Sequence, residues 1–285
     1  MRVELPGADD LTLVADAEGD PDAPPVVLFH GGGQTRHAWG TTLQVLSAHW
    51  RAYSVDLRGH GESDWAPDGD YSLDAFARDV VAVSRSLSQT PAIVGASLGG
   101  ISSLTAIAET DPPPIATALV LVDVAPRIET VGVQRIGEFM KGHLDGFATL
   151  EEVADAIGAY NPHRPRPSNL EGLKKNLRLR ADGRWVWHWD PRFVSGQFGS
   201  PDETRSTLLD GSRLHRAARA LTIPTLLVRG RMSDLLSEEG ARELLELVPH
   251  AQLADVAGAG HMVAGDRNDA FNNAVVDFLE SIRTS

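Results

Sequence analysis

The strongest chemical signal in the sequence is a serine held between small residues. The run G-A-S-L-G at residues 95–99 places Ser97 between an apolar run, residues 92–94, and a segment of helical spacing, residues 99–109. A sharp strand-to-helix turn strains the backbone and exposes one side chain above a sheet. Small neighbours let such a turn approach the surrounding chain. The same letters occur in loops that only pack, but this setting favours a nucleophilic Ser97.

A serine hydroxyl is a poor nucleophile without a base, and His261 is the candidate for that base. It lies in the run G-A-G-H-M, residues 258–262, after the last expected strand and before the last expected helix. Sites in open α/β sheets gather at the carboxyl ends of the strands. A loop histidine is usually only solvated, but this position places His261 at the same sheet edge as Ser97.

A catalytic histidine needs a carboxylate that orients its ring and stabilises the imidazolium. Two aspartates lie at the correct edge of the sheet. Asp234 follows the strand expected at residues 225–228, and Asp123 lies at the end of the strand expected at residues 118–124. We favour Asp234, because it follows the penultimate strand and precedes His261 by one helix and one strand. Asp123 is the alternative acid.

The elements that must position these side chains alternate between strands and helices. Apolar runs with little polar alternation, typical of strands buried on both faces of a parallel sheet, occupy residues 26–29, 52–55, 92–94, 118–124, 225–228 and 252–256. Helix-length segments occupy residues 41–49, 73–87, 99–109, 238–248 and 269–282, and residues 3–5 and 11–15 form a hairpin. This order predicts an α/β class protein with a mostly parallel, doubly wound sheet. Ser72 is the expected N-cap of the helix at residues 73–87.

The strand–helix rhythm breaks between residues 126 and 214. We interpret residues 126–214 as an inserted, mainly helical cap, and residues 1–125 and 215–285 as the core. The stretch at residues 185–189 holds three of the chain's six tryptophans at a period of two. We expect these indoles mainly to pack the cap against the core, with one or two of them lining a pocket.

Composition narrows the class of protein. The chain has 285 residues, 42% of them hydrophobic and 23% charged, which is ordinary for a folded domain. Its net charge of −13 repels phosphate backbones and anionic lipids, so we expect no nucleic-acid or membrane partner. The expected partner is a small-molecule substrate, and a homodimer is left open.

Cysteine is absent, which excludes disulfides, thiolate metal ligands and a thiol nucleophile. The spacing of His30, His37 and His60 fits no common ligand pattern, so no metal is expected. No long apolar run indicates a signal peptide or a membrane span, and we expect a cytoplasmic protein.

The order Ser97, Asp234, His261 on this strand pattern resembles the α/β-hydrolase superfamily, in its cap-containing members with a serine nucleophile. Three further runs strengthen the resemblance: H-G-G-G at residues 30–33, D-L-R-G-H-G-E-S at residues 56–63 and I-P-T at residues 223–225. Relatives with an aspartate nucleophile cleave epoxides or carbon–halogen bonds, and Ser97 argues against those activities.

The resemblance implies a catalytic triad of Ser97, Asp234 and His261. It also implies an oxyanion hole made by the backbone N–H groups of Gly32 and Leu98. The expected reaction is hydrolysis of a small, mainly apolar carboxylic ester or lactone through an acyl-enzyme, with no cofactor. The residues that we expect to line the substrate pocket are Trp39, Phe139, Met140, Trp187 and Met262.

Other activities fit the same triad. They are hydrolysis of a C–C bond in a diketone, acyl transfer, and cofactor-free haloperoxidase or oxygenase chemistry. A member of another class, a ligand-binding receptor of the same fold with little turnover, also remains open, because a fold does not determine a function.

Overall fold

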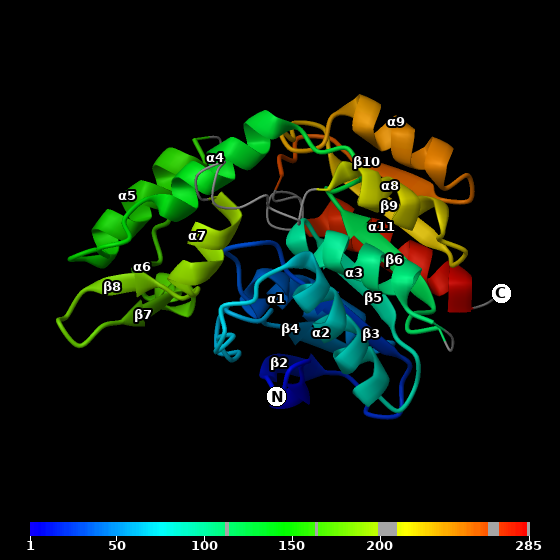
Figure 1. Cartoon of the computed structure of the whole chain (residues 1–285), viewed down its shortest axis with the longest axis horizontal. Coiled ribbons are helices and arrows are strands. Elements are labelled where there is room, and N and C mark those ends of the chain that lie inside the picture. Colours follow the sequence, from blue (N-terminus) through cyan, green and yellow to red (C-terminus); the bar gives the residue numbers. More distant parts are fainter. Residues whose placement is uncertain (112–113, 163–164, 199–209, 262–267, 284–285) are drawn as a thin grey trace.

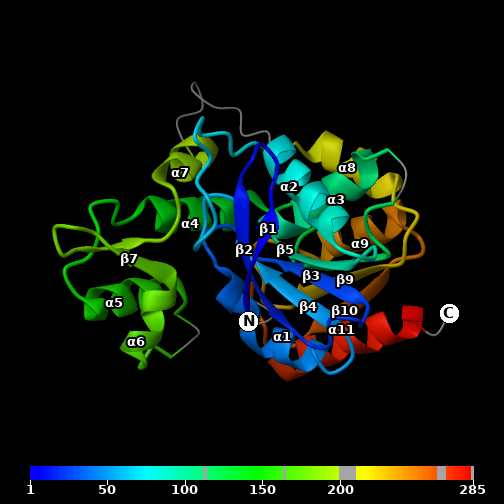
Figure 2. The same cartoon turned by 90° about the horizontal axis from the view of Figure 1, so that it is seen from below.

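The centre of the protein is a twisted sheet covered by helices on both faces (Figures 1 and 2). The computed structural model describes residues 1–111, 114–162, 165–198, 210–261 and 268–283. In these ranges the main sheet has eight strands. In spatial order they are β1 (Arg2–Pro6), β2 (Thr12–Glu18), β4 (Arg51–Val55), β3 (Pro25–Phe29), β5 (Ala92–Ala96), β6 (Ala118–Val122), β9 (Thr225–Gly230) and β10 (Gln252–Val256).

The sheet is mostly parallel. β2 pairs antiparallel with β1 and β4, and each pairing from β4 to β10 is parallel. The doubly wound α/β fold expected from the apolar runs is therefore confirmed. Parallel pairing brings the carboxyl ends of β5, β6, β9 and β10 to one edge, where the candidate side chains follow.

Alternate residues of the central strands divide between two hydrophobic clusters, one on each face of the sheet. On one face, Val27 and Ile93 belong to the cluster that also takes side chains from the helices at residues 73–86, 98–109, 211–219 and 238–247. On the other, Val26 and Val94 belong to the cluster that takes side chains from the helices at residues 40–46 and 268–283. This division explains why the strands read as continuous apolar runs.

Five of the six covering helices begin and end close to their expected positions, and the sixth, at residues 211–219, was not expected from the sequence. Their bounds are α1 (Gly40–Leu46), α2 (Leu73–Ser86), α3 (Leu98–Glu109), α8 (Gly211–Arg219), α9 (Glu238–Leu247) and α11 (Asn268–Arg283). Ser72 caps α2, because its hydroxyl accepts a 3.3 Å hydrogen bond from the Ala75 N–H group. A 3₁₀ turn, η1 (Arg36–Trp39), precedes α1.

A separate lobe, here called the insertion, comprises α4 to α7 and lies beside the sheet (Figures 1 and 2). Its elements are α4 (Thr130–Lys141), α5 (Leu150–Tyr160), α6 (Leu170–Leu173), η2 (Lys174–Asn176), β7 (Leu177–Leu179), β8 (Trp185–Trp187) and α7 (Pro191–Phe198). The strands β7 and β8 pair antiparallel. The next helix, α8, packs against α3 of the core, so the boundary expected at residue 214 falls inside a core helix.

None of the helices in the described ranges is both long enough and apolar enough to cross a membrane.

Candidate active site

Ser97 occupies a strained turn between β5 and α3. β5 ends at Ala96 and α3 begins at Leu98, so the expected strand-to-helix turn is present. Ser97 has φ 46° and ψ −112°, a conformation that costs energy for a residue with a Cβ atom and is typical of functional turns. A Cβ atom on Gly95 would lie 2.6 Å from the Gly99 carbonyl oxygen. The turn therefore depends on glycine at this position.

His261 and Asp123 are joined by a side-chain hydrogen bond. The His261 Nδ1 atom lies 2.7 Å from the Asp123 Oδ2 atom. The Asp123 side chain is fully buried, and that of His261 is 15% exposed. His261 lines the same cavity as Ser97, so its ring lies between a buried carboxylate and the chamber that contains the serine.

Two further groups fix the Asp123 carboxylate. Oδ1 accepts a 3.0 Å hydrogen bond from the Gly230 N–H group, and Oδ2 accepts one from the Ser233 hydroxyl. Asp123 itself has φ 50°, a left-handed conformation that is uncommon outside glycine. The two donors hold the carboxylate in a fixed orientation toward His261.

The expectation that Asp234 orients His261 is not met. The Asp234 carboxylate instead pairs with Arg135 of α4, at 3.1 Å between Oδ2 and Nη1. After β9 the chain turns so that Gly230 and Ser233 face Asp123, whereas the Asp234 side chain turns toward the insertion. Both aspartates follow neighbouring strands, as the sequence indicates, but the direction of this turn decides which of them meets the histidine.

The backbone N–H groups of Gly32 and Leu98 are free to bind an oxyanion. Within the described ranges no hydrogen bond from either group to the protein is found. The neighbouring amides of Gly31, Gly33 and Gly99 are occupied, with the acceptors Gln34 Oε1, His60 Nε2 and the His30 carbonyl oxygen. Gly32, Leu98 and Ser97 line one cavity.

Buried histidines hold the glycine loop at residues 31–33. His30 Nδ1 donates to the Gly31 carbonyl oxygen at 2.8 Å, and His60 Nε2 accepts from the Gly33 N–H group at 3.1 Å. Burial lowers the pKa of His30 to about 4 and that of His60 to about 3. Both rings are therefore neutral near pH 7, and each can donate with one nitrogen and accept with the other.

A third buried histidine, His188, comes from the insertion. Its Nδ1 atom accepts a 2.7 Å hydrogen bond from the Gly61 N–H group, and its Nε2 atom donates to the Gly33 carbonyl oxygen at 3.3 Å. Burial, followed by the neighbouring His60 and His30, holds its pKa well below the usual value. His188 thus joins the insertion to the glycine loop. This role is not evident from the sequence, since the position of His188 beside the tryptophans carries no chemical signature.

The cavity above Ser97 has a volume of about 560 Å³ and is lined mostly by apolar side chains. It lies between the core and the insertion, because its wall takes residues from both. Of the expected pocket residues, the structure places four in the wall: Trp39, Phe139, Met140 and Trp187. The fifth, Met262, lies outside the described residues.

Trp187 combines packing and lining. Trp187 is only 7% exposed to solvent. Its ring stacks on that of Trp189, with 5.0 Å between the ring centroids, and meets the Phe147 ring edge-on, with 5.2 Å between the centroids. Trp187 and Trp189 line the cavity and Trp185 is not among its lining residues. The three indoles therefore do not share one role.

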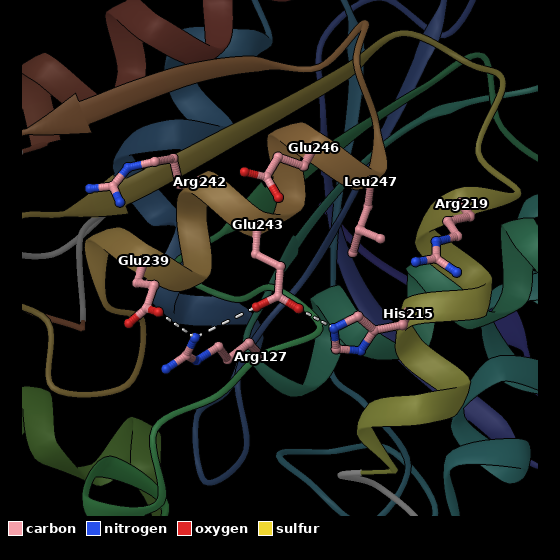
Figure 3. Close-up of a pocket in the computed structure, with 8 residues that line it drawn as sticks. All are labelled: Arg127, His215, Arg219, Glu239, Arg242, Glu243, Glu246 and Leu247. Carbon is pink, nitrogen blue, oxygen red and sulfur yellow. Dashed lines mark hydrogen bonds and ion pairs between the residues drawn. The ribbon is translucent and has the colours of Figure 1, made fainter.

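A second cavity, of about 520 Å³, lies between α8 and α9 (Figure 3). Charged side chains line it, and several neutralise one another: Arg127 pairs with Glu239 at 3.0 Å, and His215 with Glu243. Ser97, His261 and Asp123 are not among its lining residues. The cavity above Ser97 is therefore the candidate active site.

Comparison with known proteins agrees with this geometry. A family model described as "Alpha/beta hydrolase family" matches residues 26–274. Esterase Rv0045c of Mycobacterium tuberculosis is 32% identical over 267 residues, which cover 91% of this chain and 84% of that protein. A 3-hydroxybutyrate-oligomer hydrolase of Cupriavidus necator is 29% identical over 253 residues, covering 85% of this chain and 84% of the relative.

Solved structures give the same result. The M. tuberculosis esterase Rv0045c superposes with a TM-score of 0.76 at 30% identity, covering 98% of this chain and 91% of that chain. The structure of E-2-(acetamidomethylene)succinate hydrolase gives a TM-score of 0.83 at 24% identity, and the match covers 98% of this chain and 100% of that chain. The second likeness concerns the fold alone.

Proposed function

The chain belongs to the alpha/beta hydrolase family and is a hydrolase; from that premise we propose that it cleaves a small, mainly apolar carboxylic ester or lactone through an acyl-enzyme. One observation carries the proposal. Ser97, the candidate nucleophile, and His261 line one mostly apolar cavity, and His261 is hydrogen-bonded to the buried Asp123 carboxylate behind it.

In the proposed mechanism, His261 takes the proton of the Ser97 hydroxyl as the oxygen attacks the substrate carbonyl. Asp123 holds the ring through Nδ1, so that Nε2 is the atom that accepts the proton, and its charge stabilises the imidazolium. The proton then passes from His261 to the leaving oxygen. Water, deprotonated by the same ring, releases the acid and restores the serine.

The free N–H groups of Gly32 and Leu98 would bind the oxyanion of each tetrahedral intermediate. One preorganised donor contributes about 3–4 kcal/mol to such a transition state. The histidines that occupy the neighbouring main-chain groups hold the loop in place before the substrate arrives. The donors therefore need little reorganisation during the reaction.

In this proposal the insertion acts as a cap that helps to bind the substrate. Residues of α4 such as Ile136, Phe139 and Met140 form a wall of the cavity opposite the core. An apolar wall excludes water, which strengthens the electrostatic interactions within the site. It also favours a substrate with an apolar part over a highly polar one.

The test is the Ser97→Ala variant, assayed with 4-nitrophenyl butyrate and labelled with a fluorophosphonate probe. We expect turnover to fall by roughly four to six orders of magnitude, because the nucleophile is lost, and labelling to disappear. Ser47→Ala, outside the cavity, is the control and should retain both. Turnover or labelling that survives in Ser97→Ala at the wild-type rate would refute the proposal. Tight ligand binding by the wild type without any turnover would instead support the receptor alternative.

A further inference from the structure

One end of the cavity above Ser97 is polar. Five polar residues of the wall come from the segment after β3 and from η2 of the insertion: Gln34, Thr35, His37, Lys175 and Asn176. The two segments are joined by a hydrogen bond of 3.1 Å from the Thr35 hydroxyl to the Asn176 Oδ1 atom. The polar end is therefore a defined part of the wall, formed where the core meets the insertion.

The wall of the cavity differs in charge from the chain as a whole. The protein has a net charge of −13, yet no aspartate or glutamate is among the described residues that line the cavity. Acids behind the wall have partners: Asp16 lies 3.2 Å from Arg36 and 3.6 Å from His37, Asp234 pairs with Arg135 at 3.1 Å, and Asp123 contacts His261. A cationic substrate would find no counter-charge in this wall.

Lys175 supplies a positive charge to the wall of the cavity. Its side chain is exposed, and no acid among the described residues forms an ion pair with its ammonium group. The preceding Lys174 is paired, at 2.6 Å from Glu171, and lies over the ring of Trp185. The pKa of His37 is lowered, mainly by burial, then by Arg36, and in part by the Lys175 charge. Lys175 and His37 both line the cavity.

Two amide side chains add neutral donors beside this charge. Gln34 Oε1 accepts from the Gly31 N–H group at 2.9 Å, and Asn176 Oδ1 accepts from Thr35. Their NH₂ groups make no hydrogen bond within the described part of the chain. Each side chain therefore has N–H groups that it can donate to a ligand.

We propose that the substrate carries a carboxylate, bound at the polar end by Lys175, Gln34 and Asn176 while its ester group lies at Ser97. This inference rests on the proposed function and names its substrate class, a monoester of a dicarboxylic acid. A single ammonium with neutral donors balances one negative charge. No arginine lines this cavity among the described residues, so Lys175 would bind the carboxylate as a point charge and not as a bidentate fork.

The experiment compares two substrates of nearly equal shape. One is the mono-4-nitrophenyl ester of adipic acid, with a free terminal carboxylate, and the other replaces that carboxylate by a carboxamide. For the wild type we expect kcat/KM to favour the carboxylate about threefold to fivefold, the effect of a partly exposed ion pair. Lys175→Met should bring the ratio to about one, and Lys175→Glu should place it below one.

Lys174→Glu is the matched control, because it changes the net charge by the same amount on a lysine already paired outside the cavity. It should retain the wild-type ratio. A wild-type ratio of one, with hydrolysis of the carboxamide ester that still requires Ser97, would overturn the inference and leave the proposed function intact. An equal fall of the ratio in Lys174→Glu and Lys175→Glu would also overturn it, since the effect would then be one of general charge.

Binding provides a readout that does not depend on turnover. In the Ser97→Ala background, calorimetry should show that monomethyl adipate binds more tightly than its carboxamide analogue. Lys175→Glu in the same background should abolish the difference. Equal affinities of the two ligands for the Ser97→Ala protein would overturn the inference even if no ester is hydrolysed.

Discussion

Asp123 and His261 are 138 positions apart in the chain, yet the Asp123 Oδ2 atom lies 2.7 Å from the His261 Nδ1 atom. Asp123 is the first residue after β6, and His261 follows β10 and the turn after it. The strand between them, β9, contributes the Gly230 N–H group that fixes the carboxylate. The pair therefore depends on three strands meeting in register at one sheet edge.

This geometry predicts that Asp123→Asn is far more damaging than Asp234→Asn. The amide at position 123 would favour the wrong tautomer of His261, and a change of this kind in a serine triad costs about 10⁴-fold in kcat. Asp234→Asn removes a partly exposed ion pair with Arg135 and should cost less than about tenfold.

Parallel kinetics of the two variants, with melting curves to verify that both fold, decide between the aspartates. A large loss in Asp234→Asn together with wild-type turnover in Asp123→Asn would restore the assignment favoured from the sequence.

The buried histidines predict that stability falls in weak acid. The pKa of His30 is lowered to about 4 and that of His60 to about 3, from an ordinary value of 6.5. Protonation below pH 6.5 therefore favours the unfolded chain. The stabilisation is complete above about pH 6.5, and it decreases between about pH 6.5 and 4 by about 1.4 kcal/mol per pH unit for each histidine.

Urea denaturation at pH 7.5, 6 and 5 measures this slope. His188→Gln removes one of the buried rings, whose pKa is also lowered, and should make the dependence on pH shallower while reducing stability at pH 7.5. A slope equal to that of the wild type would mean that His188 does not stay neutral in the fold.

The wall formed by α4 predicts control of acyl-chain length. Ile136 lines the cavity, so Ile136→Trp should fill part of it. We expect kcat/KM for 4-nitrophenyl octanoate to fall about tenfold relative to the acetate, the cost of losing one or two buried methylene groups. Val131, on the same helix but 70% exposed, provides the control Val131→Trp. If the two variants show the same chain-length profile, α4 does not limit the acyl group.

Much of the core could be predicted because its signals are local. Apolar runs indicated the strands, Ser72 indicated the start of α2, and small residues around Ser97 indicated the turn. The choice between Asp123 and Asp234 could not be made in this way. It depends on the path of the chain after β9, where Gly230 and Ser233 face one aspartate.

The insertion was harder to predict, because its important contacts reach across the fold. His188 binds Gly61 and Gly33, which are 127 and 155 positions away. Lys175 differs from Lys174 only in what surrounds it. Neither residue has a neighbour in the sequence that distinguishes it from an ordinary polar side chain.

The double contact of His188 limits how this protein can be recombined with its relatives. A chimera that receives a foreign insertion without an equivalent imidazole would leave the Gly61 N–H group and the Gly33 carbonyl oxygen without their partners. Each unsatisfied buried group costs about 1–3 kcal/mol, and the loop that carries Gly32 would lose a support. The insertion and the glycine loop should therefore be exchanged together. In a library of chimeras, the crossover points should be placed so that both segments come from the same parent protein.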